Sequence, residues 1–165
     1  MVIRNPLIDP IGAPRRLFGT RRRGRSPETT SRIMSRIRCR DTLPERMLGA
    51  AMRALGLRLR KQVRAIGKPD FGLKKYKLAI FVDGDFWHGH EWALKGYSGP
   101  EEMFRRYPKY WRDKFRRNAR RDSFVNETLK SDGWTVIRFW ASDVKKDATR
   151  CAGVVLEAMK ERGWV

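Results

Sequence analysis

Two short apolar segments constrain the fold of this chain most strongly, because a helix-compatible stretch separates them. Residues 77–82 (KLAIFV) and 134–140 (WTVIRFW) are rich in β-branched and aromatic side chains, a composition typical of buried strands. Residues 101–132 are predicted to be mostly helical, with Pro108 interrupting the helix early. Three side chains of this stretch are expected in the core: Phe115, Phe124 and Leu129. The alternation of strand and helix predicts a small α/β domain.

Two further helices are predicted outside these segments. Thr42 can cap a helix with Glu45 in its first turn, and this helix is expected to end near Gly56. Apolar side chains recur in it at four-residue spacing: Leu43, Met47, Ala51 and Leu55. Residues 143–162 carry a second helical stripe: Val144, Ala148, Cys151, Val155 and Met159. Gly163 is expected to end this helix. The whole order favours a central mixed β-sheet flanked by helices.

The charge of the chain indicates a polyanionic partner. Its 38 Lys and Arg against 18 Asp and Glu give a net charge of +20. Residues 1–30 contain four of the eight prolines and seven arginines without a helical or strand period, so we expect a flexible basic arm. Such an arm either binds nucleic acid or is merely solvated, and composition leaves both open. The apolar content suffices for one folded domain, residues 31–165.

Neither a membrane span nor a disulfide framework is expected. The chain has no run of 18 apolar residues, and its N-terminal arginines lack the apolar stretch of a signal peptide. The two cysteines, Cys39 and Cys151, are interpreted as reduced thiols. We therefore expect a soluble, cytoplasmic protein that has no membrane partner.

The densest group of chemically capable side chains comprises Asp70 and residues 83–90 (DGDFWHGH). Two carboxylates that leave adjacent strands at one edge of a sheet, here Asp70 and Asp83, can hold one hard divalent cation. His88 can then take a proton from the attacking water. Each residue alone has a plain alternative, as a turn cap, a strand end or a packed ring. Their clustering on a basic chain, together with both of its histidines, favours a catalytic site.

Five segments together are similar to one known family. They are residues 31–37 (SRIMSRI), 41–45 (DTLPE), 68–71 (KPDF), 80–90 (IFVDGDFWHGH) and 133–140 (GWTVIRFW). In order and spacing they resemble the very short patch repair (Vsr) endonucleases, which belong to the PD-(D/E)xK nuclease superfamily. The similarity extends over roughly residues 30–162. It implies a restriction-endonuclease-like fold, a Mg²⁺ cofactor and a double-stranded DNA substrate, in a bacterial or phage protein associated with the nucleoid.

The resemblance implies roles for individual residues. Asp70 matches the metal-binding aspartate of the family. His88 matches the histidine that activates the water, and Asp122 matches the acid paired with that histidine. An acid so far along the chain can orient the ring only if the helix of residues 109–132 folds back beside the strand.

Three other residues match positions that lie near the metal in the family. Glu45 matches an acid on the first helix of the family, near the metal through water, but the capping-box role beside Thr42 is an equally good explanation. Val82 stands where the family contributes a backbone carbonyl to the metal. Asp83 departs from the best-known repair enzymes, which have histidine there, and an aspartate would strengthen metal binding.

The structural zinc of the family is not expected in this chain. Its ligands correspond to four positions: Asp85, His90, Trp92 and Ser142. Only His90 retains a family ligand, and one His with one Asp makes a poor closed tetrahedral site. We expect His90 at the surface or as a supporting partner of the site, rather than as a ligand.

Phe86, Trp87 and Trp111 match aromatic side chains that the family wedges between base pairs, although the two tryptophans alone would suggest core. Ring-on-base stacking replaces the base stacking that is lost, and a mismatch lowers the cost of opening. Residues 105–121 carry nine Lys or Arg and one Asp, as expected of a helix that follows a DNA groove. The predicted DNA-binding residues there are Lys114, Arg116, Arg117, Asn118, Arg120 and Arg121.

Three functions remain open at this stage. The first is a Mg²⁺-dependent endonuclease that acts as a monomer in mismatch repair and nicks duplex DNA 5′ of the mispaired T of a T:G mismatch. The second is a similar enzyme of a restriction, homing or mobile-element system that cuts a site without mismatch specificity. The third is a catalytically inactive DNA-binding protein, against which the joint presence of the four candidate catalytic groups speaks.

Overall fold

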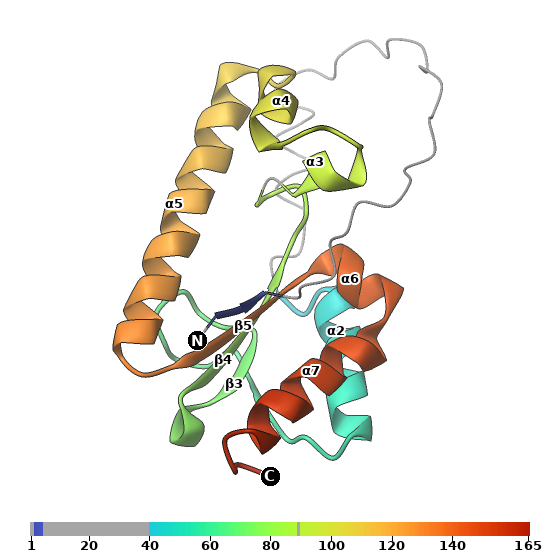
Figure 1. Ribbon diagram of the computed structural model, residues 1–165, viewed down its shortest axis with the longest axis vertical. Helices are drawn as coiled ribbons and strands as arrows, with labels where there is room; N and C mark the ends of the chain where they lie inside the picture. Colours follow the sequence, from blue (N-terminus) through green and yellow to red (C-terminus); the bar gives the residue numbers. More distant parts are fainter. Residues whose placement is uncertain (1, 5–39, 89) are drawn as a thin grey trace.

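A mixed five-stranded sheet forms the centre of the computed structural model, which describes residues 2–4, 40–88 and 90–165 (Figure 1). The strand order is β1-β5-β4-β3-β2. The strands are β1 (Val2–Arg4), β2 (Arg60–Lys61), β3 (Phe71–Leu73), β4 (Leu78–Asp83) and β5 (Thr135–Trp140). Strand β5 is parallel to β4 and β1, whereas β3 is antiparallel to β4 and β2. The predicted α/β fold with a central mixed sheet is confirmed.

Helices cover both faces of this sheet (Figure 1). They are α2 (Leu43–Ala54), α3 (Glu91–Leu94), α4 (Pro100–Arg105), α5 (Lys109–Ser131), α6 (Ala141–Lys146) and α7 (Ala148–Lys160), with a 3₁₀ turn, η1, at Lys74–Tyr76. Helices α2, α6 and α7 pack together against one face. The long helix α5 lies along the other face, where Val125 and Leu129 contact the sheet. The helix break expected at Pro108 separates α4 from α5.

The two central strands are apolar because both of their faces are covered. In β4, Leu78 and Ile80 point into the larger core with α2 and α7, whereas Ala79 and Phe81 point towards α5. Side chains of a strand alternate between faces, so a run without polar residues is the pattern of a strand buried on both sides. Both segments predicted to be strands from this pattern are strands in the structure.

Helix α2 buries only part of the stripe expected, since Met47 and Ala51 pack against the larger core whereas Leu43 and Leu55 do not. Its buried residues are Pro44, Glu45, Leu48, Gly49 and Met52, whereas Leu43 is 55% exposed and Leu55 38% exposed. A spacing of four residues drifts around a helix with 3.6 residues per turn, so the expected stripe could not stay on one face. The absence of a side chain at Gly49 matters here, because a Cβ would lie only 3.2 Å from the ring of Phe71.

Two other helical predictions are wrong in detail. Residues 143–162 do not form one helix, because Asp147 ends α6 and its carboxylate accepts a hydrogen bond from the Arg150 N–H (2.8 Å), which starts α7. Phe124 is 60% exposed instead of lying in the core, because the sheet-facing positions of α5 are one and five residues further on, at Val125 and Leu129.

Part of the N-terminal region lies outside the described residues. This applies to residues 5–30 of the predicted arm, to the 31–37 motif and to Cys39. Residues 2–4, for which no strand was expected, form β1 beside β5. Cys151 is a buried free thiol. Among the helices of the described ranges, none is both long enough and apolar enough to cross a membrane.

Candidate active site

The candidate catalytic side chains meet at one edge of the sheet. Asp83 is the last residue of β4, and Asp70 directly precedes β3, which runs antiparallel to β4. The end of one strand and the start of its antiparallel neighbour lie at the same edge. The loop that carries His88 leaves β4 at this edge, and the body of α5 brings Asp122 alongside. Helix α5 therefore folds back beside the strand as the resemblance required.

Asp70 is a partly buried carboxylate whose negative charge is poorly compensated. Burial raises its pKa to about 6, and Glu45 and Asp83 add to this, while the backbone N–H of Val82, which donates to Oδ2 at 2.7 Å, and the charge of Arg138 lower it. A divalent cation would relieve this unfavourable charge, so the residue fits a metal ligand. The described residues contain no group of three or more His, Cys, Asp or Glu that could hold a metal. An ion at Asp70 would therefore need backbone carbonyls and water as further ligands, which Mg²⁺ accepts readily.

His88 is held by Asp122 across the loop–helix contact. Its Nδ1 lies 2.5 Å from Asp122 Oδ2. Burial alone would raise the pKa of Asp122, but the hydrogen bond and charge of His88, with Arg138 and Arg121, keep it below its ordinary value. An ionised carboxylate only accepts hydrogen bonds, so Nδ1 carries the proton and Nε2 is left as the basic nitrogen. This is the arrangement of a general base with an orienting acid.

Asp83 is engaged by a residue that the sequence analysis did not select. Arg138 of β5 donates from Nε to Asp83 Oδ2 and from Nη2 to Asp83 Oδ1, both at 2.6 Å. The same guanidinium donates from Nη1 to Asn126 Oδ1 at 3.0 Å. Asp83 Oδ1 also lies 3.8 Å from His88 Nε2. A charged residue inside an otherwise apolar strand segment was the available signal for Arg138.

Glu45 binds the residues at the start of α2 and also influences Asp70. Its Oε1 accepts from the Thr42 hydroxyl at 2.7 Å and its Oε2 from the Asp41 N–H at 2.8 Å, so it organises the start of α2. It also lies close enough to Asp70 to raise the pKa of that carboxyl. The expected contact differs in one respect, since the Thr42 side chain bonds to Glu45 and not to a backbone N–H of the helix.

The three aromatic residues of the predicted wedge form one cluster. The ring of Phe86 contacts Trp87, Tyr107, Trp111 and Phe115 edge-on, with centroids 5.0–6.1 Å apart. Trp87 and Trp111 lie 5.8 Å apart, and the Lys114 ammonium sits 4.8 Å from the centre of the Trp87 ring. Phe86 thus forms the inner part of the cluster, while the two tryptophans and Lys114 form a cationic aromatic surface beside His88.

The basic residues predicted to bind DNA differ in their surroundings. Asn118 donates from Nδ2 to the Trp87 carbonyl at 2.6 Å, so in this structure it holds the aromatic loop. Arg116 pairs with Glu101 at 3.0 Å, and Arg121 lies 3.3 Å from Asp122 Oδ1. Arg117 and Arg120 are exposed. The outer face of α5 therefore presents a row of cations next to the candidate catalytic groups.

Hydrogen bonds join three of the four residues that match the zinc ligands of the family: Asp85, His90 and Ser142. Asp85 accepts from the Ser142 hydroxyl at 2.6 Å and from the Ser142 N–H at 3.0 Å, and its Oδ1 lies 3.0 Å from His90 Nδ1. The His90 ring stacks on Trp140 with 4.1 Å between centroids. His90 is only 6% exposed, so the expectation of a surface position is wrong; it is a supporting partner of Asp85. Trp92 packs against the aromatic cluster.

Comparison with known proteins places this geometry in a family. The family profile described as DNA mismatch endonuclease Vsr matches residues 25–94, which include Asp70, Asp83 and His88. The chain is 44% identical over 138 residues to the type II nicking enzyme V.NmeDIP of Neisseria meningitidis serogroup C, covering 83% of this chain and 90% of that protein.

Two further relatives support this placement. The type II nicking enzyme V.HpaIIP of Haemophilus parainfluenzae is 40% identical, over 74% of this chain and 84% of the relative. The DNA mismatch endonuclease Vsr of Escherichia coli K12 is 33% identical, over 68% of this chain and 69% of that protein. The chain belongs to the Vsr family of DNA endonucleases.

Proposed function

We propose that this endonuclease is Mg²⁺-dependent and nicks duplex DNA on the 5′ side of the mispaired T in a T:G mismatch. The observation that carries the proposal is the His88–Asp122 pair, 2.5 Å apart, at the same sheet edge as the partly buried Asp70. Hydrolysis of a phosphodiester bond can use a general base to activate water and a carboxylate-bound divalent cation to stabilise the phosphate charge. The alternative of an inactive DNA-binding protein is set aside, since the relatives are endonucleases and nicking enzymes.

The chain's own residues would divide the work as follows. Asp70 and the backbone carbonyl of Val82 would hold the metal, which would neutralise charge on the scissile phosphate. His88 takes a proton from the attacking water at Nε2. Asp122 keeps the Nδ1–H in place and stabilises the imidazolium that results. Glu45 stands close enough to Asp70 to bind water of the metal.

Mismatch specificity is supported by the cationic aromatic surface. Trp87 directly precedes His88, the candidate base, and Trp111 and Lys114 lie against the Trp87 ring. Aromatic rings inserted at a base step replace lost stacking at about 1–3 kcal/mol per base, and a mispaired step costs less to open than a paired one. The E. coli relative named a mismatch endonuclease supports the same substrate.

A second candidate is favoured by the names of other relatives. V.NmeDIP and V.HpaIIP are called type II nicking enzymes, which fits an enzyme that works beside a restriction system. The proposal for this case is a nick within a particular sequence whether or not a mismatch is present. The physiological partner system would differ, but the same residues would perform the chemistry.

One nicking assay tests the proposal and separates the two candidates. Duplexes of matched sequence containing T:G or T:A are incubated with the protein in Mg²⁺ or in EDTA, and the nicked strand and position are read on a denaturing gel. We expect cleavage 5′ of the mispaired T, only with Mg²⁺. Equal rates on T:G and T:A would remove mismatch specificity and favour the second candidate.

Two variants connect this activity with the site. Asp70→Asn keeps the shape of the side chain and is expected to abolish the nick. Glu127→Gln removes an equal charge from an exposed position of α5 and is expected to cut like the parent. Full cleavage by Asp70→Asn would contradict the assignment of the metal site.

A further inference from the structure

Arg138 is a buried cation that joins the two carboxylates flanking His88. Only 7% of its side chain is exposed, and it lies in the central strand β5. Its guanidinium makes a two-pronged contact with Asp83, with both N–O distances at 2.6 Å, and its Nη2 lies 3.4 Å from Asp122 Oδ1. The ring of Phe81 packs beneath the guanidinium at 4.5 Å. Paired hydrogen bonds of this kind fix the carboxylate in direction as well as in distance.

Both nitrogens of the His88 ring face a carboxylate held by this guanidinium. Nδ1 contacts Asp122 Oδ2 at 2.5 Å, and Nε2 lies 3.8 Å from Asp83 Oδ1. Both oxygens of the Asp83 carboxylate therefore accept a hydrogen bond from Arg138. This is a different environment from that of Asp70, whose pKa is raised chiefly by burial.

We infer that Arg138 is a positioning residue for the nicking reaction: it fixes Asp83 and Asp122, and through them it sets the orientation of the His88 ring. Asp83 then acts as part of this clamp and not as a ligand of the metal. The inference rests on the proposed function, since it concerns the orientation of the proposed general base. Groups that orient a ligand or base typically contribute 10–100-fold to activity.

The first test separates positioning from folding with paired variants. Arg138→Met alone leaves Asp83 as a buried unpaired charge and endangers the fold. The double variant Asp83→Asn with Arg138→Met removes both charges and is expected to fold, as checked by thermal unfolding. We expect its single-turnover nicking rate to fall about 10–100-fold while its Kd for the same duplex in EDTA stays within about twofold. Nicking at the parent rate by the folded double variant would overturn the inference.

Two further readouts sharpen this test. The chain has two histidines, so the ¹⁵N signals of the His88 ring can be assigned with a His90→Gln variant. We expect one Nδ1–H tautomer in the parent and a mixture in the double variant; an unchanged tautomer would contradict positioning. Arg138→Lys should recover only part of the rate, because lysine cannot make the two-pronged contact.

The metal dependence decides the role of Asp83. The Mg²⁺ concentration for half-maximal nicking should be unchanged in Asp83→Asn, if that carboxylate belongs to the clamp. A tenfold rise would make Asp83 a metal ligand and overturn that part of the inference. The parent enzyme is the reference in each of these experiments. Absence of nicking by the parent would contradict the proposed function, whereas a difference between parent and variants bears on the inference about Arg138 and Asp83.

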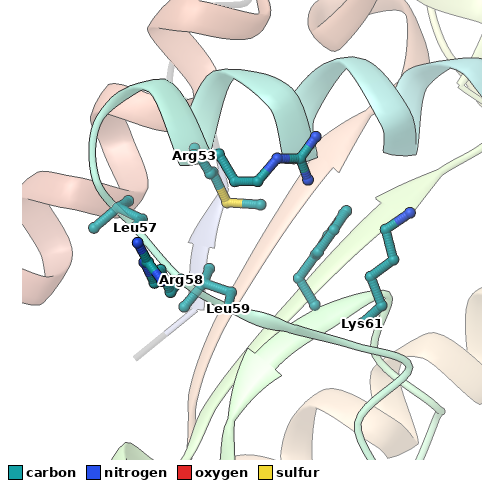
Figure 2. A pocket seen from close by; sticks show the side chains of 8 residues that line it. Arg53, Leu57, Arg58, Leu59 and Lys61 are labelled. Carbon is teal, nitrogen blue, oxygen red and sulfur yellow. The ribbon is translucent and has the colours of Figure 1, made fainter.

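A second, independent observation is a hollow with a cationic rim on the α2 side of the molecule. Figure 2 shows that it lies beneath α2, and its volume is about 310 Å³. Its lining residues are Gly49, Met52, Arg53, Leu57, Arg58, Leu59, Lys61 and Phe71. Within the described ranges, the side chains of Arg53 and Arg58 form no hydrogen bond or ion pair, while Lys61 pairs with Asp41 at 2.6 Å.

The chemistry of this hollow suits a sugar–phosphate unit. Arg53 and Lys61 reach into it from opposite sides, the first from α2 and the second from β2 (Figure 2). Arg53 and Arg58, whose side chains have no partner within the described ranges, can together with the apolar floor bind an anion that carries an apolar part. Phe71 in the lining directly follows Asp70, so the hollow begins one residue along the chain from the proposed metal ligand.

We propose that this hollow binds a backbone phosphate and sugar of the DNA. It would be a second DNA contact, separate from the aromatic loop and α5, and it rests on the proposed function. Phosphate contacts of this kind position the duplex without reading its sequence.

Salt dependence tests the second proposal. Each lost phosphate contact lowers the slope of log Kd against log salt by about 0.9, so Arg53→Ala with Arg58→Ala should lower it by about 1–2. The control, Lys130→Ala with Arg162→Ala, removes the same charge elsewhere and should leave the slope nearly unchanged. The nicking rate at saturating DNA should stay at the parent value in the control. Equal slopes for the two double variants would overturn the proposal.

Discussion

The two faces of the central sheet are built from the same two strands but have different functions. On the α2 and α7 side, β4 and β5 contribute mainly apolar side chains, including Ile80, Ile137 and Phe139, to the larger core. On the α5 side, the apolar contacts of Ala79, Phe81 and Val136 give way to Asp83 and Arg138. The alternation of side chains along a strand lets one segment serve both purposes.

The difference shows where stability and chemistry are separated in this fold. The larger core on the α2 side is apolar, and burial in it raises the pKa of the Cys151 thiol to about 11. The α5 face concentrates its charges at the end of the strands, where the loop of His88 begins. Substitutions on the first face should therefore change stability, and substitutions on the second should change nicking.

The largest effect is expected at His88. Replacement by Gln removes the nitrogen that takes the proton and should lower the nicking rate about 10²–10⁴-fold, the usual contribution of a general base. Binding of the duplex in EDTA should change little, since His88 is 14% exposed and faces carboxylates. Single-turnover kinetics beside Glu127→Gln measure this effect, and a His88→Gln enzyme with more than a tenth of the parent rate would place the base elsewhere.

The opposite result is expected at Ile137 on the apolar face. This side chain is fully buried in the larger core, and Ile137→Ala should lower the free energy of unfolding by about 2–5 kcal/mol. The folded fraction should nick at the parent rate. Urea unfolding measures the loss, with Leu43→Ala, which is 55% exposed, as the control. A large loss of activity at full folding would break the division between the two faces.

The sequence predicted the division between strands and helices because the signals were local. Apolar runs mark β4 and β5, and the turn residues around them mark their ends. The buried face of α2 was predicted only in part, because burial there depends on how the helix meets Phe71, through Gly49. Phe124 was misplaced for a similar reason, as only the approach of α5 to the sheet decides which positions are covered.

The residues of the site could be selected from the sequence, but the contacts between them could not. Asp70, His88 and Asp122 could be selected by resemblance, and the structure brings them to one edge. The pairing of Asp83 with Arg138 joins residues 55 positions apart, and no local pattern indicates it. The same holds for the contact of Asn118 with the Trp87 carbonyl, where a residue predicted to bind DNA holds a loop.

A smaller effect is expected on stability at Asp70, with a defined pH dependence. Its pKa in the folded protein is about 6, above the ordinary 3.8, because burial disfavours the charged form. The folded state thus binds a proton more tightly than the unfolded state, so this carboxyl favours folding at low pH, and that contribution is lost as pH rises from about 4 through 6.

The Asp70→Asn variant removes this dependence. In EDTA it should be more stable than the parent at pH 7.5, by about 1–3 kcal/mol, and the advantage should shrink towards pH 4. Urea unfolding at both pH values measures the difference. A variant that is less stable than the parent at pH 7.5 would show that Asp70 is compensated by other groups, which would weaken its assignment as a metal ligand.

The smallest effect is expected on the outer face of α5. Phe124 is 60% exposed, and Phe124→Ser should change the free energy of unfolding by less than about 0.5 kcal/mol. Leu129→Ala on the inner face of the same helix should cost about 2–5 kcal/mol, because Leu129 is 1% exposed and packs against the sheet. If Phe124→Ser instead weakened binding of the duplex at unchanged stability, the exposed ring would itself contact DNA, and the DNA-binding surface of α5 would extend beyond its basic segment towards the C-terminal end of the helix.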